Sequence, residues 1–387
     1  MNTIKFLIKC LVWFFLHILY LFPVNRKKIF FTSFLGDFTC NPKYIYLWLR
    51  EQFPNEFIYV WEFSDKSKNT EAKADRVVKH LSPRFLFEVM TSRFIITNSI
   101  FLWCIPKRKS QILINTWHGG GAYKTMGRNC EWNKSWVAQK QEMILGNKTD
   151  FFVSSCRKFT EVFSSSYFIS EAKVIKSGMP RNAVLFLPER SGQLSEKVRS
   201  AFSIPQDTKI VLYAPTYRGN ALLKKHEESK RSYDLLDFYL LKSSCEKKIG
   251  GEFVILYRSH YLDSRLKNSL PDFVIDATKY EDMQELLCAA DILVTDYSSS
   301  MWDFALTGKP CFLYAPDIDK YIAERGFYTD PATWPFPLAR SEDALHENIA
   351  RFDGEKYAAA VRKHLEDLGS YENKDACRKV CEAIGVC

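Results

Sequence analysis

The chain has 387 residues, of which 47% are hydrophobic and 15% aromatic, and it carries a formal net charge of +9. This length is too great for one ordinary domain and suits two, and a composition without low-complexity tracts or fixed-period repeats excludes a disordered or solenoid protein. The basic balance suits an anionic membrane surface or an anionic polymer, and nucleic acid ranks last because no zinc-finger spacing, helix-turn-helix signal or RNP-like aromatic stripe is present.

An apolar run at residues 10–24, interrupted only by His17, follows Lys5 and Lys9 and precedes three basic residues at 26–28. It lacks the small-residue cleavage site of a signal peptide and is shorter than the roughly 20 apolar residues of a spanning helix. Two alternatives stay open: a helix in the membrane interface and a buried core helix. The aromatic residues and the basic flanks favour the first, so we expect residues 1–24 to form a membrane-associating helix on an anionic leaflet.

Short apolar runs alternate with helical patterns along the rest of the chain. In the first half we expect strands at 28–34, 57–63, 94–98, 111–116, 150–154 and 173–177, and helices at 42–53 and 83–90. In the second half we expect strands at 209–214, 253–257, 273–276, 291–295 and 311–314, and helices at 234–245, 283–290, 301–306, 342–351, 356–368 and 374–384.

Strands separated by helices imply parallel sheets covered on both faces. We therefore predict an α/β fold with two Rossmann-like domains and a cleft between them. The polar stretch at 187–196, which contains Pro188 and Gly192, marks the boundary. The domains then span 25–190 and 191–387, and we expect the last helix to cross back onto the first domain.

The eleven cysteines show no CxxC or Cys/His zinc spacing. Cys10, Cys288 and Cys311 lie in apolar runs, which predicts small core residues. Cys377 and Cys381 are four residues apart and would share one helix face. We expect the cysteines to be reduced and the chain to face the cytosol.

The first polar motif follows the predicted strand at 111–116, where Trp117 and His118 precede three glycines. His118 titrates near neutral pH and could accept a proton from a hydroxyl. Gly119 and Gly120 would let a substrate approach the backbone closely, and Lys124 could sit on a phosphate. The alternative is a structural turn with a hydrogen-bonded histidine, but the glycine triplet favours a functional site.

Two further motifs follow strands of the second half. Arg258 could bind a phosphate bidentately, and His260 could donate to a leaving-group oxygen, although the pattern alone is weak. After the strand at 209–214, Thr216 and Arg218 could touch a nucleotide or phosphate. An ordinary turn from strand to loop would explain the motif with Thr216 and Arg218 equally well.

A strand, polar turn, helix and strand are predicted between residues 292 and 314. Asp296, Ser298 and Ser299 follow the strand, and serines at a helix N-terminus favour an anion because the backbone N–H groups there are unpaired. Asp303, about one turn further, could reach ribose hydroxyls. The alternative is that a serine merely caps the helix. Asp317-Ile318-Asp319 has the DxD spacing, but it opens a turn after a proline and we expect no metal site.

These motifs give the chain a resemblance to the CDP-glycerol glycerophosphotransferase family, the teichoic-acid and capsule polymerases and primases with a GT-B-like fold. They run in family order from about residue 28 to about 330. The matching segments are NPKY (41–44), TWHG (116–119) with Lys124, GMPRN (178–182), YAPT (213–216), RSH (258–260), TDYSS (295–299), DF (303–304), GKP (308–310), DIDKY (317–321) and RGF (325–327).

The resemblance implies that an acceptor hydroxyl attacks the β-phosphorus of a CDP-alditol and that CMP leaves. It implies His118 as base, and Arg258 and His260 as groups that bind or protonate the pyrophosphate. It further implies that Ser298 and Ser299 hold phosphate and that Asp303 contacts the cytidine ribose. From their places after predicted strands we also assign Thr216, Arg218 and Asp296 to the donor side, and Gly119, Gly120, Lys124 and Arg181 to the acceptor side. Phosphoryl transfer needs mainly positioning and charge neutralisation, which such groups supply.

The resemblance further implies CDP-glycerol or CDP-ribitol as donor substrate, no cofactor, and a lipid-linked glycan or polyol-phosphate polymer as acceptor. With the basic balance and the apolar N-terminus, it suggests a peripheral protein at the cytoplasmic face of the membrane. The acceptor-side domain would be 25–190, and the donor-binding domain, with its closing helices, 191–387.

The chain departs from the family pattern at a few positions. Gly120 and Gly121 stand where Thr-Pro is frequent, and Ala183 stands where an aspartate often follows Pro-Arg-Asn. The long extensions of many polymerases are absent from the sequence, so primase and polymerase behaviour stay open, as does the acceptor. A GT-B glycosyltransferase using a nucleotide sugar and a non-catalytic membrane-bound subunit of a polysaccharide assembly complex are the alternative functions.

Overall fold

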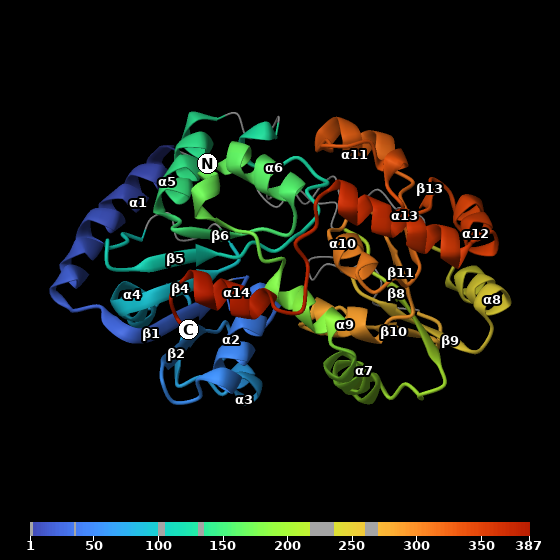
Figure 1. The fold of residues 1–387 in the computed structure, drawn as a ribbon, viewed down its shortest axis with the longest axis horizontal. Coiled ribbons are helices and arrows are strands. Elements are labelled where there is room, and N and C mark those ends of the chain that lie inside the picture. Colours follow the sequence, from blue (N-terminus) through green and yellow to red (C-terminus); the bar gives the residue numbers. More distant parts are fainter. Residues whose placement is uncertain (1–2, 35, 100–104, 131–134, 217–235, 260–269) are drawn as a thin grey trace. The chain divides into compact units, whose positions relative to one another are not determined.

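The computed structural model describes residues 3–34, 36–99, 105–130, 135–216, 236–259 and 270–387. Its contacts divide the chain into two units, Met1–Phe186 with Leu368–Cys387, and Leu187–Asp367. Each unit contains one parallel sheet with helices packed on it (Figure 1). The prediction of an α/β fold with two parallel sheets is confirmed.

The first unit has a seven-stranded sheet in the order β3-β2-β1-β4-β5-β6-β7, and every pair of neighbours is parallel. Because β1 lies beside both β2 and β4, the strand order reverses between β1 and β4, which is where open α/β sheets bind ligands. The strands are β1 (Asn25–Thr32), β2 (Ile58–Glu62), β3 (Arg76–Val78), β4 (Ser92–Thr97), β5 (Ile112–Asn115), β6 (Phe151–Val153) and β7 (Val174–Ile175).

Helices cover both faces of this sheet because successive strand residues point to opposite sides. Phe30 of β1 packs with Phe85 of α4 on one face, and Phe31 packs with Tyr46 of α2 on the other. Both phenylalanines are fully buried, so the apolar residues 29–31 of β1 are covered from both faces of the sheet. The helices of the unit are α1 (Thr3–Phe15), α2 (Cys40–Gln52), α3 (Asn69–Ala72), α4 (Pro83–Thr91), α5 (Trp136–Lys148), α6 (Arg157–Tyr167) and α14 (Ala376–Ala383), with 3-10 segments that include η1 (Leu16–Leu21) and η7 (Pro180–Phe186).

Helix α14, near the C-terminus, packs on α2 and η7 of the first unit. Cys377 and Cys381 lie on its buried face together with Val380. The spacing of four residues thus places both thiols against the core, as expected for one helix face.

The second unit has a six-stranded parallel sheet in the order β10-β9-β8-β11-β12-β13, and its strand order reverses between β8 and β11. The strands are β8 (Lys209–Tyr213), β9 (Phe253–Tyr257), β10 (Val274–Asp276), β11 (Ile292–Thr295), β12 (Cys311–Tyr314) and β13 (Leu338–Ala339). The helices are α7 (Pro188–Phe202), α8 (Phe238–Ile249), α9 (Met283–Ala289), α10 (Ser300–Ala305), α11 (Ile318–Glu324), α12 (Glu342–Ala350) and α13 (Gly354–Asp367).

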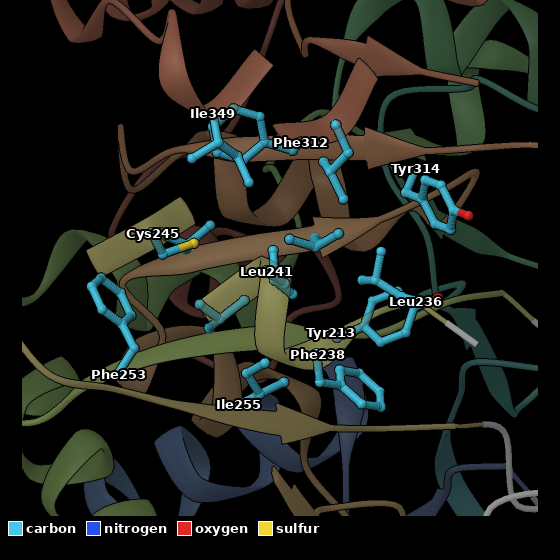
Figure 2. Packing of buried hydrophobic residues seen from close by; sticks show 14 of the residues in the cluster. Tyr213, Leu236, Phe238, Leu241, Cys245, Phe253, Ile255, Phe312, Tyr314 and Ile349 are labelled. Carbon is cyan, nitrogen blue, oxygen red and sulfur yellow. The ribbon is translucent and has the colours of Figure 1, made fainter. Parts of the chain in front are cut away.

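Figure 2 shows the core on one face of the second sheet. Phe253, Ile255 and Phe312 come from its strands, and they meet Leu241 of α8 and Ile349 of α12. All five side chains are at most 1% exposed. This core fixes the strands whose carboxyl ends carry the polar motifs.

Several local expectations are corrected by the structure. The stretch at 187–196, where we predicted the boundary, is helical from Pro188 onwards as the first part of α7, and the second unit begins at Leu187. Cys288 and Cys311 are buried as predicted, but Cys10 is exposed. Lys28, read as part of a basic flank, is only 2% exposed and pairs with Glu88 at 2.7 Å.

The apolar N-terminal run forms helix α1 followed by the 3-10 helix η1, not one continuous helix. The described side chains of α1 are exposed, whereas Leu16 and Leu19 of η1 pack on the core. A fully buried core helix is therefore not what the run forms. Within the described residues, no helix has both the length and the apolar character needed to cross a bilayer.

Candidate functional site

In the first unit, the loops that follow β1, β4 and β5 lie together, because these strands are neighbours and parallel. They contribute Phe34, Asn98 and His118 at the carboxyl edge of the sheet. This edge includes the point where the strand order reverses. The predicted histidine is therefore in a position where this class of sheet builds ligand sites.

His118 is held by its Nδ1 atom, which lies 2.8 Å from the backbone oxygen of Asn98. A carbonyl oxygen can only accept, so Nδ1 carries the hydrogen and Nε2 keeps its lone pair. The ring stacks on Trp117 at 4.5 Å and meets the edge of Phe34 at 5.4 Å, both between ring centroids. The imidazole is thus fixed in the tautomer that can accept a proton at Nε2.

Burial lowers the pKa of His118 to about 4. The hydrogen bond to Asn98 acts in the opposite direction, while the positive charges of Arg181 and Lys124 lower the pKa further. The imidazole is neutral at physiological pH. The same two cations make its surroundings favourable for an anionic group.

The loop that carries His118 is pinned by residues of α2 and η7. The Asn41 side-chain amide donates to the carbonyls of Thr116 and Trp117 at 3.0 and 2.9 Å. Its oxygen accepts from the backbone N–H of Arg181, whose guanidinium donates to the His118 carbonyl at 2.8 Å. These bonds hold Trp117 in a left-handed conformation with φ of +52°.

The predicted acceptor-side residues lie around this loop. Gly119 and Gly120 are buried, and Lys124 is half-buried. The left-handed glycine of the triplet is Gly121, with φ of +75°, and its N–H donates to the Ser155 hydroxyl. Arg181 is only 7% exposed, so part of its role is to hold the His118 backbone.

In the second unit, Thr216 and Asp296 meet across the reversal point between β8 and β11. The backbone N–H of Thr216 lies 3.0 Å from both carboxylate oxygens, and its hydroxyl lies 2.5 Å from Oδ1. The N–H of Tyr297 also donates to Oδ1, at 2.5 Å. Asp296 is 1% exposed, so this buried carboxylate holds the loop after β8 against the loop after β11.

Arg258 follows β9, the other neighbour of β8. Its Nη2 donates to the Glu281 carbonyl at 3.2 Å, and its Nη1 lies 3.6 Å from the sulfur of Met283. The side chain is half-buried at the same sheet edge as Thr216. His260 and Arg218 lie outside the described residues.

The serine turn precedes the six-residue helix α10. Ser298 accepts from the N–H and the hydroxyl of Ser300 at 3.3 and 2.9 Å, whereas the Ser299 side chain makes no capping hydrogen bond. Both Ser298 and Ser299 are half-buried, and Asp303 is 2% exposed. The capping alternative therefore describes Ser298 in part and does not describe Ser299.

Among the described residues, the structure thus places His118 at the carboxyl edge of the first sheet, and Thr216, Arg258 and Asp296 at the carboxyl edge of the second. Reasoning from sequence missed Asn98 and Phe34 as neighbours of His118. Asn98 ends the strand predicted at 94–98. Its neighbourhood to His118 could have been predicted only by placing that strand beside the one at 111–116, so that both carboxyl ends meet at one edge of the sheet.

Comparison with known proteins gives these sites a context. The profile of the family CDP-Glycerol:Poly(glycerophosphate) glycerophosphotransferase matches residues 14–385. The teichoic acid poly(glycerol phosphate) polymerase of Bacillus spizizenii is 30% identical over 375 residues, which cover 94% of this chain and 93% of the polymerase.

The corresponding polymerase of Staphylococcus epidermidis is 31% identical over 373 residues, and this chain spans about half of it, 51%. A solved structure of the wall teichoic acid polymerase TagF superposes with a TM-score of 0.79 at 26% identity, covering 96% of this chain and 92% of that one. The resemblance read from the ordered motifs is confirmed: the chain belongs to the CDP-glycerol:poly(glycerophosphate) glycerophosphotransferase family.

Proposed function

We propose that this protein transfers glycerol phosphate, or a related alditol phosphate, from a CDP-alditol to a hydroxyl group of a lipid-linked or polymeric cell-surface glycan and releases CMP. Membership of the family supports the reaction class. The observation that carries the proposal is the His118 imidazole, neutral and held with Nε2 free of the Asn98 hydrogen bond. Such a group can accept the proton of an attacking hydroxyl.

In the proposed reaction, the acceptor O–H gives its proton to Nε2 of His118 as its oxygen attacks the β-phosphorus. The bond between that phosphorus and the oxygen bridging to the α-phosphorus breaks, and its electron pair leaves with CMP. An anionic substrate beside His118 would offset the charges of Arg181 and Lys124, which lower its pKa, and so make the imidazole a stronger base.

On the donor side, we propose that Arg258 neutralises diphosphate charge and that Ser298 and Ser299 bind phosphate oxygens. Thr216 and Asp296 would hold the loops that receive the nucleotide, and their mutual hydrogen bonds support this role. Asp303 as a ribose contact, and Arg218 and His260 as phosphate contacts, stay predictions. The reaction so described needs charge neutralisation and positioning more than covalent chemistry by the protein.

We further propose that the N-terminal segment lies on the cytoplasmic face of an anionic membrane. Large apolar side chains of α1 and of the residues after it are exposed: Leu7, Leu11, Val12, Trp13, Phe14, Phe15, Ile18, Tyr20, Leu21 and Phe22. Arg108 anchors η1 to the first unit, because its guanidinium donates to the carbonyls of Leu19 and Phe22. The exposed basic residues Arg26 and Lys27 would add electrostatic attraction to anionic lipid.

The decisive experiment offers the purified protein CDP-glycerol, CDP-ribitol and nucleotide sugars with a lipid-linked glycan acceptor, and monitors nucleotide release. CMP release from a CDP-alditol is expected, and His118→Ala should abolish it while CDP-glycerol still binds. A His364→Gln variant is the control, because that histidine lies in the second unit beside Phe336 and belongs to none of the predicted motifs. Turnover of a nucleotide sugar in place of CDP-alditols would show a glycosyltransferase, and full activity of His118→Ala would refute the base.

A further inference from the structure

Asn98 is a fully buried polar residue directly after β4, the strand between β1 and β5. Neither its side chain nor its backbone has a role in the reaction proposed above beyond the single contact to His118. Buried amides are held by specific partners, and those partners show what the residue does. Here they belong to the loops on both sides of β4.

The side chain of Asn98 binds the loop that follows β1. Its Nδ2 donates to the Ser33 hydroxyl at 3.0 Å, and its Oδ1 accepts from the backbone N–H of Phe34 at 3.1 Å. Its backbone oxygen binds the loop on the other side of β4, because it accepts from Nδ1 of His118, which follows β5. One residue therefore connects three adjacent strand ends.

Phe34, which Asn98 holds, lies against the imidazole of His118. Its φ of +43° lies in the left-handed region, which a bulky aromatic residue adopts only when other contacts impose it. The ring is 45% exposed, yet its edge lies against the His118 ring at 5.4 Å. The Asn98 bond to the Phe34 N–H thus helps keep an aromatic wall beside the histidine.

We propose that Asn98 is a positioning residue for His118. Through its carbonyl it selects the tautomer with hydrogen on Nδ1, and through its side chain it holds Phe34, which limits rotation of the ring. An amide suits this place because it donates to Ser33 and accepts from Phe34 at the same time. The proposal rests on the proposed role of His118 as base, and it adds the residue that orients the base.

The test compares Asn98→Ala, Asn98→Asp and a matched control. Asn98→Ala removes both side-chain bonds, so the loops can shift, and a misplacement of about 1 Å is expected to lower kcat on the order of 100-fold with little change in the KM for CDP-glycerol. Asn98→Asp keeps an acceptor for Phe34 and can accept from the Ser33 hydroxyl, so it should restore much of the loss. Ser33→Ala removes one bond and should lower kcat less than Asn98→Ala.

Gln111→Ala is the matched control. Gln111 is also a buried amide of the first sheet, and its Nε2 donates to the carbonyls of Val89 and Ser92, both at 2.8 Å. It precedes β5, whereas Asn98 follows β4, so it lies at the opposite edge of the same parallel sheet. Its substitution should lower stability without lowering kcat.

Nitrogen-15 NMR of histidine-labelled protein reads the imidazole directly, with His118 assigned by comparison with His118→Gln. We expect the Nδ1–H tautomer in the wild-type protein. In Asn98→Ala the carbonyl of residue 98 is still present, but loss of the bonds to Ser33 and Phe34 lets the loops shift away from it, so we expect a mixture of tautomers. An Nε2–H tautomer in the wild type, or Asn98→Ala with the kcat of Gln111→Ala and unchanged imidazole signals, would overturn the inference.

These experiments distinguish failure of the positioning role of Asn98 from failure of the proposed function. If the wild type transfers alditol phosphate and His118→Ala does not, the proposed function stands whatever Asn98→Ala does. If the wild type shows no transfer, the proposed function fails, and the NMR comparison still decides whether Asn98 orients His118. If Asn98→Ala does not fold, Ser33→Ala supplies the comparison with Gln111→Ala, because it removes one of the two side-chain bonds of Asn98.

Discussion

Thr216 donates two hydrogen bonds to Asp296, from its backbone N–H and its hydroxyl, across the point where the strand order of the second sheet reverses. The carboxylate also accepts from the N–H of Tyr297 and is 1% exposed. A buried carboxylate that accepts several N–H and O–H groups is costly to alter, because each donor would be left without its partner. The pair therefore fixes the two loops that we propose for the donor.

Asp296→Asn should lower the free energy of unfolding by about 1–3 kcal/mol, because one acceptor oxygen becomes a donor facing the Thr216 N–H. Affinity for CDP-glycerol should fall about tenfold, since 1 to 2 kcal/mol of lost positioning corresponds to that factor. Urea denaturation and calorimetric titration with CDP-glycerol measure the two effects. Thr216→Ser keeps the hydroxyl and is the control; if Asp296→Asn bound CDP-glycerol like the wild type, the pair would have no part in donor binding.

The strands and their polar ends were predictable because they depend on local sequence. Apolar runs such as 292–295 are followed at once by polar residues, and the structure has β11 at Ile292–Thr295. Features that depend on distant residues were not predictable. Lys28 looked like a basic flank, but β1 begins at Asn25 and carries it inward to Glu88, 60 residues away in sequence.

The candidate site was also predictable only where a local sequence pattern marks a residue. His118 stood out because a titratable side chain precedes three glycines, whereas Asn98 binds it through a backbone oxygen that no side-chain pattern reports. Helix α7 was missed for another reason. Its polar composition suggested only a domain boundary, which the structure has at Leu187, although Pro188 at the first helical position is a start signal for a helix.

The lowered pKa of His118 predicts a loss of stability at mildly acid pH. The unfolded imidazole titrates near 6.5 and the folded one near 4, so between these values the unfolded chain binds more protons and stability falls as the pH falls. At pH 5 this effect is at most about 2 kcal/mol. His118→Gln should therefore lose less stability than the wild type between pH 7 and pH 5 in urea denaturation.

The difference between the two proteins isolates His118 from other titrating groups. The pKa of His364 is lowered to about 4 by burial and acts in the same direction, whereas the pKa of Glu62 is raised by burial and acts in the opposite one. His364 and Glu62 are present in both proteins, so their contributions cancel when the stability of His118→Gln is compared with that of the wild type. Equal losses of stability in wild type and His118→Gln would mean that the folded imidazole titrates near its ordinary pKa.

Gly178→Ala should destabilise the first unit by about 2 kcal/mol or more. Gly178 has φ of +81°, and a Cβ there would lie 2.7 Å from the Cα of Glu372 and 2.8 Å from the carbonyl oxygen of Tyr371. Glu372 accepts from the Met179 N–H at 2.9 Å, so a shift would loosen the loop that carries Arg181. Thermal unfolding measures the change.

Gly192→Ala is the matched control for that substitution. Gly192 lies inside α7, and nothing lies within 4 Å of a Cβ built on it. Alanine should stabilise this helix by up to about 1 kcal/mol, because glycine is the poorer helix former. If Gly178→Ala unfolded at the wild-type temperature or above, the close approach of residues 371 and 372 would not constrain the folded protein.

Replacement of Phe14 and Phe15 by glutamate should reduce binding to vesicles that contain anionic phospholipid. The two rings are 67% and 69% exposed, and burial of each in an interface would contribute about 1.5–3 kcal/mol, so their joint loss should weaken binding at least tenfold. Because the side chains are exposed, the variant should unfold like the wild type. Vesicle sedimentation at low and high salt measures both the apolar and the electrostatic parts of the attraction. Leu240→Glu, at a residue of α8 that is 43% exposed, is the control and should bind vesicles like the wild type; equal binding by Phe14→Glu/Phe15→Glu would show that α1 does not lie on the membrane.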